Sequence, residues 1–321
     1  MSVYTSITSE ELTQFLTHYE VGTLVDYQGI LAGIENTNYF VTTTQGVFVL
    51  TLFEQHTAQE LDYFLKLMQF WAEQGIPTAR PISNQEGQLL SILKAKPAAL
   101  VQRLPGSTIQ TPNTEQCYEL GQWLARMHLS AQHFPLYRAP DRGHEWRMQV
   151  GQELLPYFQG TDHALLKAEL AYQDSVNWKQ LPQGTIHADL FRDNALGSDQ
   201  QLTGIIDLYY ACYDAWLYDL AIVINDWCYD TGELNESRLL ACLQGYHELR
   251  PLTVLERASG VALMRAAALR FWLSRALSQR NPPSGTLTFL KDPQEFKIKL
   301  LSIIEATPSL EANWHTLSAA K

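Results

Sequence analysis

The stretch "HADLFRDN", residues 187 to 194, places a histidine, two aspartates, an arginine and an asparagine within eight positions. It follows an apolar run that ends at Ile186, and a second apolar run begins at Leu202. Aspartate and asparagine often do no more than close a turn, and that interpretation is open for these residues taken alone. By itself, therefore, the stretch does not distinguish a catalytic loop from a turn.

A second observation is Asp207, which comes thirteen residues after Asn194 at the end of the apolar run "GII". The pattern H-x-D-x-x-x-x-N with a later aspartate is typical of the catalytic loop and the metal-binding aspartate of kinase-like folds. Asp189 would accept the proton of an acceptor hydroxyl. Asn194 and Asp207 would offer hard oxygen ligands to Mg²⁺ on the phosphates of ATP, and His187 would brace the loop.

The order of the predicted elements supports this interpretation. Residues 1–103 read as mostly β, with a short first helix after a capping box that begins at Thr8. A hairpin turn is expected at Gln45–Gly46, and apolar residues at helical spacing predict an amphipathic helix over 58–74. Two further strands should follow, separated by a turn at Lys96–Pro97. This part of the chain would form a small β lobe with one important helix.

The remaining chain reads as helical after the Pro- and Gly-containing connector "LPGSTIQTPN", and only two β-rich pieces interrupt it. We therefore expect an α+β, protein kinase-like two-lobe fold. Residues 1–103 would be an ATP-binding lobe built on a small antiparallel sheet. Residues 104–321 would be a larger, mainly helical lobe that holds the catalytic loop and the substrate pocket.

Composition narrows the function classes. A formal net charge of −11 argues against a nucleic-acid partner, since such proteins usually present a basic surface. The apolar-looking stretch 205–224 carries three aspartates, which argues against a membrane span, and the first residues lack the features of a signal peptide. The four cysteines form no C-x-x-C pair. We expect reduced, buried thiols in a cytoplasmic protein, without a zinc site or disulfides.

With these residues in view, a resemblance emerges. "HADLFRDN" and the later "YDLA" resemble the aminoglycoside phosphotransferase and choline kinase superfamily. Within it, "AGIENTNYFV", "VLTLFE", "KPAALVQRLPG", "ALRFWLSR" and "KDPQEF" resemble bacterial homoserine kinases of this type, over residues 32–296. The resemblance implies transfer of the γ-phosphate of ATP to the side-chain hydroxyl of L-homoserine, a step towards threonine, with Mg²⁺ as the metal.

The ATP site is expected in the first lobe. The loop "AGIENTN" stands in place of the usual glycine-rich loop, and Gly33, Asn36 and Asn38 could turn tightly and present backbone N–H groups to phosphate. A simple surface turn is an equally open interpretation of this loop. The resemblance implies that adenine meets the strand backbone near Val101 and Gln102. No G-K-[ST] occurs, which excludes a P-loop.

The acceptor has an ammonium, a carboxylate and a primary hydroxyl, so its pocket needs both an acid and a cation. Arg270 and Arg275 interrupt the apolar stretch "ALRFWLSRAL" and are candidates for the carboxylate, although they could also extend to water from the edge of a core helix. Arg138 is a second candidate. Asp214 or Asp219 could bind the ammonium, and Asp219 could instead brace the catalytic loop.

One residue departs from the kinase pattern. Thr51 stands on the strand "GVFVLTLFE" where kinases place a lysine that holds the α and β phosphates. An inactive, nucleotide-binding pseudokinase is therefore one alternative. A kinase for aminoglycosides, choline or another amino alcohol is the other, and its pocket would lack paired arginines. The sequence does not predict an oligomeric state.

Overall fold

The computed structural model describes residues 4–30, 36–198, 201–281 and 291–317. The chain forms two compact units. The first contains Met1–Gly106 together with Thr203–Tyr209, and the second contains Ser107–Leu202 and Tyr210–Lys321. Compared with the expected division into 1–103 and 104–321, two segments belong to the first unit instead: 104–106, and 203–209, which carries Asp207.

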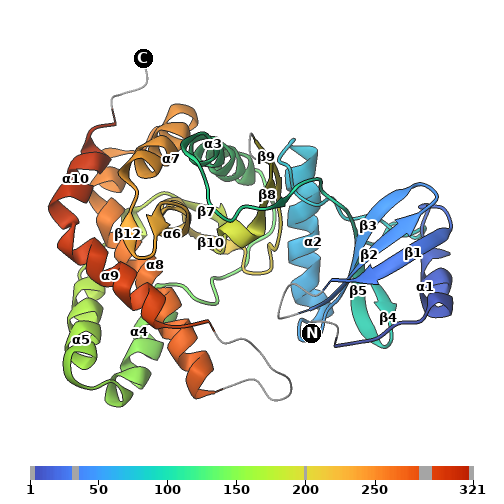
Figure 1. Ribbon diagram of the computed structural model, residues 1–321, viewed down its shortest axis with the longest axis horizontal. Coiled ribbons are helices and arrows are strands. Elements are labelled where there is room, and N and C mark those ends of the chain that lie inside the picture. The colour runs from blue at the N-terminus through green and yellow to red at the C-terminus, as the bar shows by residue number, and fades with distance from the viewer. Residues whose placement is uncertain (1–3, 31–35, 199–200, 282–290, 318–321) are drawn as a thin grey trace. The chain divides into compact units, whose positions relative to one another are not determined.

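The first unit is built on a five-stranded antiparallel sheet with the strand order β1-β2-β3-β5-β4. Figure 1 shows its two helices on opposite sides of this sheet. The strands are β1 (Leu24–Gly29), β2 (Thr37–Thr43), β3 (Gly46–Leu52), β4 (Ser91–Leu93) and β5 (Lys96–Gln102), and the helices are α1 (Ser9–Leu16) and α2 (Ala58–Glu73).

The predicted elements of this unit are confirmed where periodicity and capping are strong. α1 begins with the expected capping box between Thr8 and Glu11, and its apolar face packs against Leu50 and Leu52 of β3. α2 covers the helix predicted over 58–74 almost to the residue. Along β2 every second side chain is buried, as the period of a strand requires.

The turn predicted at Lys96–Pro97 is wrong. Both residues lie at the start of β5, where a proline is tolerated because few ladder hydrogen bonds are needed there. The turn is made instead by Lys94 and Ala95, both with left-handed backbone angles (φ of 55° and 57°). Two consecutive residues with positive φ are typical of the tight turn between twisted antiparallel strands.

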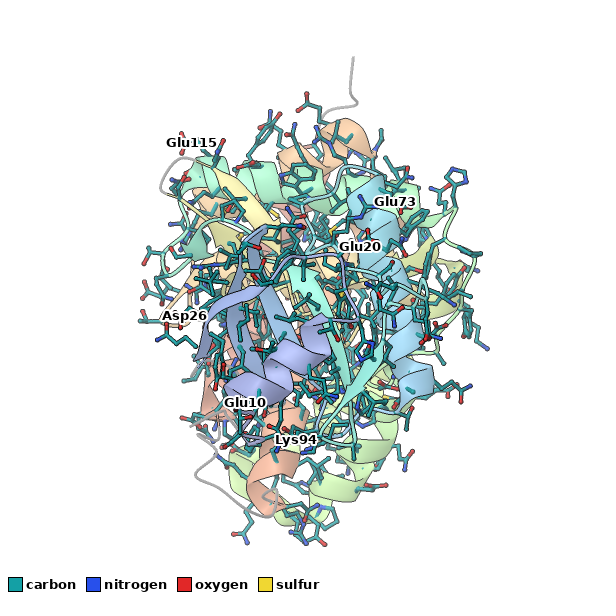
Figure 2. All side chains as sticks on the ribbon, turned by 90° about the vertical axis from the view of Figure 1, so that its right-hand side faces the viewer. Glu10, Glu20, Asp26, Glu73, Lys94 and Glu115 are labelled. Atoms are coloured by element: carbon teal, nitrogen blue, oxygen red, sulfur yellow. The ribbon has the colours of Figure 1, made fainter. Side chains whose placement is uncertain are left out.

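Acidic side chains lie on the surface of the first unit. Glu10, Glu20 and Asp26 are exposed, and Figure 2 shows them on the face that it turns to the viewer. Lys94, which Figure 2 also labels, pairs with Glu11 at 2.5 Å between Nζ and Oε1. These exposed acids contribute to the net charge of −11.

The second unit is mainly helical. Its helices are α3 (Thr114–Ala131), α4 (His144–Leu154), α5 (Gly160–Asp174), α6 (Trp216–Trp227), α7 (Glu236–Leu249), α8 (Val254–Arg280), α9 (Gln294–Glu305) and α10 (Thr307–His315). Short antiparallel pairs join β6 (Ser107–Thr108) to β8 (Ala195–Gly197), β7 (Gln183–Ile186) to β10 (Cys212–Ala215), and β11 (Tyr229–Asp230) to β12 (Glu233–Leu234). β9 (Leu202–Ile205) leads out of this unit into the first.

The long helix α8 organises the packing of the second unit. It packs against α4, α5, α6, α9 and α10, and most of its middle is buried (Figure 1). α3 and α7 approach closely because Gly121 of α3 faces the carbonyl oxygen of Cys242 and Gly245 of α7 faces that of Tyr118, and a Cβ atom at either glycine would collide with that oxygen. All four cysteines are free and buried, as predicted. Within the described residues, no helix combines the length and apolar character needed to cross a membrane.

One strand pair positions the site. β7 ends at Ile186, which pairs with Cys212 at the start of β10. Since the two strands are antiparallel, the residues that follow β7 and those that precede β10 emerge at the same end of the pair. The stretch 187–194 therefore begins beside Tyr210 and Cys212, and β10 leads directly into α6.

Candidate active site

The stretch 187–194 forms a loop with an unusual backbone. Ala188 has a left-handed conformation with φ of 64°, and Arg192–Asn194 form a single 3₁₀ turn. A left-handed conformation costs a residue with a Cβ atom about 1–2 kcal/mol. The loop therefore needs other interactions to hold it in this shape.

Asp219 supplies those interactions. This side chain is completely buried in the first turn of α6. Its Oδ2 accepts a hydrogen bond from the N–H of His187 and its Oδ1 accepts one from the N–H of Ala188, both at 2.8 Å. A third donor, His128 Nε2, lies 3.1 Å from Oδ2. Asp219 thus takes the bracing role that was one of its two predicted roles.

The charge state of this network follows from its donors. Burial alone would raise the pKa of Asp219, but the hydrogen bonds from His128 and from the backbone of His187 lower it below its ordinary value. Burial lowers the pKa of His128 itself, so its ring is neutral. Because a carboxylate only accepts, Nε2 of His128 carries the proton and Nδ1 accepts from the hydroxyl of Tyr246 at 2.7 Å.

The three predicted catalytic residues lie together in the second unit. Asp189 is partly buried, with 18% of its side chain exposed. Asn194 Nδ2 donates to the backbone oxygen of Asp189 at 2.8 Å and lies 3.4 Å from its Oδ2. His187 is fully buried and its Nδ1 accepts from the N–H of Asp189 at 3.3 Å. These contacts fix the carboxylate of Asp189 relative to the loop.

Arg270 joins this group from α8. Its guanidinium is buried, donates to the carbonyl oxygen of Ala188, and lies 3.5 Å from Oδ1 of Asp189. Burial raises the pKa of Asp189 above its ordinary value, and the charge of Arg270 opposes that rise. A raised pKa makes a carboxylate a better proton acceptor, which is what a general base near neutral pH requires.

The first unit holds the other predicted metal ligand. Asp207 has a left-handed backbone with φ of 61°, and its charge adds to the effect of burial in raising the pKa of Tyr209. Thr51, at the position expected for a lysine, donates through Oγ1 to Oδ1 of Asn38 at 2.7 Å. Neutral, hydrogen-bonded groups therefore stand where kinases place a cation.

The chemistry of the predicted metal ligands fits Mg²⁺. Asp207 offers a carboxylate and Asn194 an amide oxygen, the hard ligands that this ion prefers. The part of the chain that the structure describes contains no group of three or more His, Cys, Asp or Glu side chains arranged to hold a metal. This is compatible with an ion that takes most of its ligands from nucleotide phosphates and water.

The other predicted nucleotide ligands belong to the first unit. Gly33 lies outside the described residues. Asn36 is buried and its Oδ1 accepts from the N–H of Glu54 at 3.4 Å. Val101 pairs with β3, and the N–H of Gln102 donates to the carbonyl oxygen of Arg80 at 2.8 Å. The contact of these residues with nucleotide stays a prediction.

A small cavity of about 10 Å³ lies beside the catalytic loop, entirely within the second unit. Its lining includes Arg142, Ala188, Tyr210, Asp214, Tyr218 and Arg270. Among the predicted substrate residues it thus contains one acidic side chain, Asp214, and one basic side chain, Arg270. It also contains Arg142, which the sequence analysis did not single out.

Arg138 and Arg275 are engaged in ion pairs, Arg138 with Asp141 at the pocket lining and Arg275 with Glu295 of α9. Arg138 Nη2 lies 2.8 Å from Oδ2 of Asp141. Arg275 Nη1 lies 2.6 Å from Oε2 of Glu295, whose pKa is lowered to about 2 because the hydrogen bond of Arg275 and the charge of Lys299 outweigh burial. Neither arginine is among the residues that line the pocket beside Ala188.

Two acidic residues line this pocket: Asp141, which pairs with Arg138, and Asp214. Burial raises the pKa of Asp214 above the ordinary value, while the charge of Arg147 and a hydrogen bond from the N–H of Ala215 (2.7 Å) oppose the rise. Arg147 is itself buried and stacks over the rings of Tyr218 (4.7 Å) and Trp178 (4.8 Å). Sequence reasoning missed Arg147, because nothing in its neighbourhood along the chain indicates a buried cation.

Comparison with known proteins identifies the family. Residues 26–267 match the model of the phosphotransferase enzyme family. The chain belongs to this family. The phosphotransferase is 45% identical to the homoserine kinase of Methylobacillus flagellatus, over 98% of this chain and 99% of that protein. It is 44% identical to the homoserine kinase of Neisseria meningitidis serogroup B, over 94% of this chain and 100% of that protein.

A solved structure confirms the fold. The phosphotransferase superposes on spectinomycin phosphotransferase, solved with ADP and spectinomycin, with a TM-score of 0.69. The match covers 95% of this chain and 99% of that chain at 16% sequence identity. The predicted kinase-like fold, with an antiparallel sheet in the first part and a mainly helical second part, is therefore correct.

Proposed function

We propose that this phosphotransferase is a homoserine kinase, which transfers the γ-phosphate of ATP to the side-chain hydroxyl of L-homoserine to give O-phosphohomoserine. The observation that carries the proposal is the pocket beside Ala188, where Asp214 and Arg270 place opposite charges next to the catalytic loop. The two relatives named as homoserine kinases, at 45% and 44% identity, support the same acceptor.

The chemistry assigned to the catalytic loop is proton acceptance and positioning. Asp189 accepts the proton of the homoserine hydroxyl. As it does so, the hydroxyl oxygen of homoserine bonds to the γ-phosphorus, and the bond between the γ-phosphorus and the oxygen of the leaving ADP breaks. Arg270 and Asn194, through the contacts described above, keep the carboxylate pointed at the acceptor. Asp219 keeps the loop in its left-handed shape. Positioning of this kind supplies most of the catalysis in phosphoryl transfer.

The metal ligands complete the assignment. Asn194 and Asp207 are the proposed ligands, and each carries a hard oxygen of the kind that Mg²⁺ prefers. When bound with ATP, the ion would reduce the negative charge of the phosphates, which eases attack by an oxygen nucleophile. In the first unit, Thr51 and Asn38 offer only neutral hydrogen-bonding groups to the nucleotide.

The acceptor pocket favours an α-amino acid over a purely cationic acceptor. The carboxylate of Asp214 suits the ammonium of homoserine, and the guanidinium of Arg270 adds positive charge to the pocket, which favours an acceptor that carries a carboxylate. Choline and aminoglycosides bring only positive charge to the same place, so a buried arginine disfavours them. The four reduced cysteines suit a protein of the cytoplasm.

The proposal is tested by measuring ADP release from the purified protein with Mg-ATP and single acceptors: L-homoserine, choline, kanamycin and methylthioribose. The expected result is rapid release with homoserine only, abolished in Asp189→Asn. Turnover with choline or kanamycin but not with homoserine would contradict it. If no acceptor raises ADP release while ATP still binds, the chain is a nucleotide-binding pseudokinase.

A further inference from the structure

We infer that Arg142 binds the carboxylate of the acceptor and so makes the pocket specific for an α-amino acid. This inference rests on the proposed function and concerns the pocket beside Ala188. Of the arginines at positions 138, 142, 270 and 275, only Arg142 and Arg270 line this pocket.

Arg270 is already engaged by the catalytic loop. One of its terminal nitrogens donates to the carbonyl oxygen of Ala188 and the other faces Asp189 at 3.5 Å. A guanidinium binds a carboxylate best through two parallel N–H groups. Because both terminal nitrogens of Arg270 point to the loop, this residue orients the base and contributes positive charge. It has no free pair of terminal nitrogens for a substrate carboxylate.

Arg142 has a different environment. Its Nη2 donates to the hydroxyl of Tyr210 at 3.3 Å, and its guanidinium lies over the rings of Tyr210 (4.8 Å) and Trp146 (5.8 Å). None of the described carboxylates lies within ion-pair distance of it, whereas Arg138, four residues earlier, pairs with Asp141 at 2.8 Å. Arg142 is therefore a cation that is held by neutral aromatic groups and lines a pocket beside the base.

The backbone around Arg142 is fixed against the acidic side of the pocket. The carbonyl oxygen of Arg138 accepts a hydrogen bond from the N–H of Tyr213 at 2.8 Å, which ties the loop to β10. At Gly143 a Cβ atom would lie 2.7 Å from Cγ of Pro140 and 3.5 Å from Oδ2 of Asp214. Such close packing leaves the loop little room to move. It holds Arg142 in the same small pocket as Asp214.

This pairing of charges matches the chemistry of the acceptor class. An α-amino acid carries its ammonium and its carboxylate on the same carbon, so a site for it needs an anion and a cation a few ångströms apart. Asp214 and Arg142 provide these two charges from two neighbouring segments. An acceptor without a carboxylate would leave Arg142 beside an unneutralised ammonium, which costs binding free energy.

The experiment compares Arg142→Gln with Arg138→Gln, a matched substitution on the same loop. Loss of a charge-assisted pair should raise the KM for L-homoserine by about 10- to 100-fold in Arg142→Gln. The rise should exceed that in Arg138→Gln by at least about tenfold. Arg142→Lys keeps the positive charge but loses the two parallel N–H groups of the guanidinium. Its KM for L-homoserine should lie between those of wild type and Arg142→Gln.

A second acceptor separates recognition from damage. 3-Aminopropan-1-ol is homoserine without its carboxylate, so kcat/KM for it should stay within about threefold of wild type in Arg142→Gln, and the preference for homoserine should fall. The dissociation constant of Mg-ATP, measured by calorimetry, should not change. The inference is overturned if the KM for homoserine is unchanged, if both acceptors lose activity equally, or if Arg138→Gln has the larger effect.

The same data keep the two proposals apart. A wild-type protein that does not phosphorylate homoserine refutes the proposed function, and the role of Arg142 with it. A wild-type protein that uses homoserine, with a variant that uses it equally well, refutes only the role of Arg142.

Discussion

Replacement of Asp219 by asparagine is the most informative single perturbation of the catalytic loop. The carboxylate of Asp219 accepts three hydrogen bonds, from the backbone of His187 and Ala188 and from the ring of His128. Asparagine has nearly the same shape but only one accepting oxygen. Its amide nitrogen must face at least one of these donors, so that two N–H groups are left opposite each other in a fully buried place.

The size of the effect follows from these contacts. Leaving one buried donor unsatisfied costs about 1–3 kcal/mol. The bonds that remain lose the negative charge of their acceptor, which roughly halves their strength. Together we expect a loss of about 3–5 kcal/mol in the free energy of unfolding. The lost hydrogen bonds hold the left-handed backbone at Ala188, and this backbone positions Asp189. We therefore expect kcat to drop by about a hundredfold or more, which corresponds to about 2.7 kcal/mol.

The assay combines urea unfolding with steady-state kinetics on L-homoserine. Glu169→Gln is the matched control, since Glu169 is an equally buried carboxylate that binds Arg265 and Gln173 and not the catalytic loop. We expect both variants to lose stability and only Asp219→Asn to lose kcat in its folded fraction. Equal losses of kcat in the two variants, or a kcat within threefold of wild type in Asp219→Asn, would refute the bracing role.

The remaining predictions concern Asp189, Asp207 and Thr51. Asp189→Asn should reduce kcat by about a hundredfold or more while calorimetry shows unchanged ATP binding. In the wild type, kcat should fall as the pH drops through the pKa of Asp189, which burial places above its ordinary 3.8; a flat profile down to pH 4 would argue against this base. Asp207→Ala should lose Mg²⁺-dependent activity, and a metal titration curve identical to that of wild type would show that Asp207 is no ligand. Thr51→Val removes one neutral hydrogen bond, worth about 0.5–1.5 kcal/mol, and should raise the KM for ATP by no more than about tenfold. Thr51→Lys should bring no gain in turnover, whereas a tenfold gain would favour a degraded kinase.

The parts of the fold that the sequence predicts well are those fixed by neighbouring residues. α1 and α2 begin at capping boxes and α2 follows a regular apolar spacing, so local interactions define them. The catalytic loop is predictable for the same reason, because Asp189 and Asn194 are close along the chain. The position of the turn before β5 was predicted wrongly because Pro97 is by itself a strong turn signal. The residues that adopt the left-handed backbone angles of the turn are Lys94 and Ala95.

The lining of the pocket beside Ala188 was only partly predictable from the sequence. Asp214 and Arg270 were identified because charged residues in apolar stretches stand out. Arg142 was not, because its place in the pocket depends on the packing of its loop against β10, some seventy residues later in the sequence. Arg275 was a reasonable candidate from its surroundings, but its partner Glu295 lies on another helix, and no pattern along the chain predicts that pair.

The central claim is that this phosphotransferase acts on homoserine, and a competition experiment tests it most directly. L-Homoserine, choline and kanamycin are mixed at equal concentration with Mg-ATP and the purified protein, and the phosphorylated products are identified by mass spectrometry and phosphorus NMR. We predict O-phosphohomoserine as the main product by at least about a hundredfold, and none with Asp189→Asn. Phosphocholine or phosphorylated kanamycin as the main product would contradict the claim.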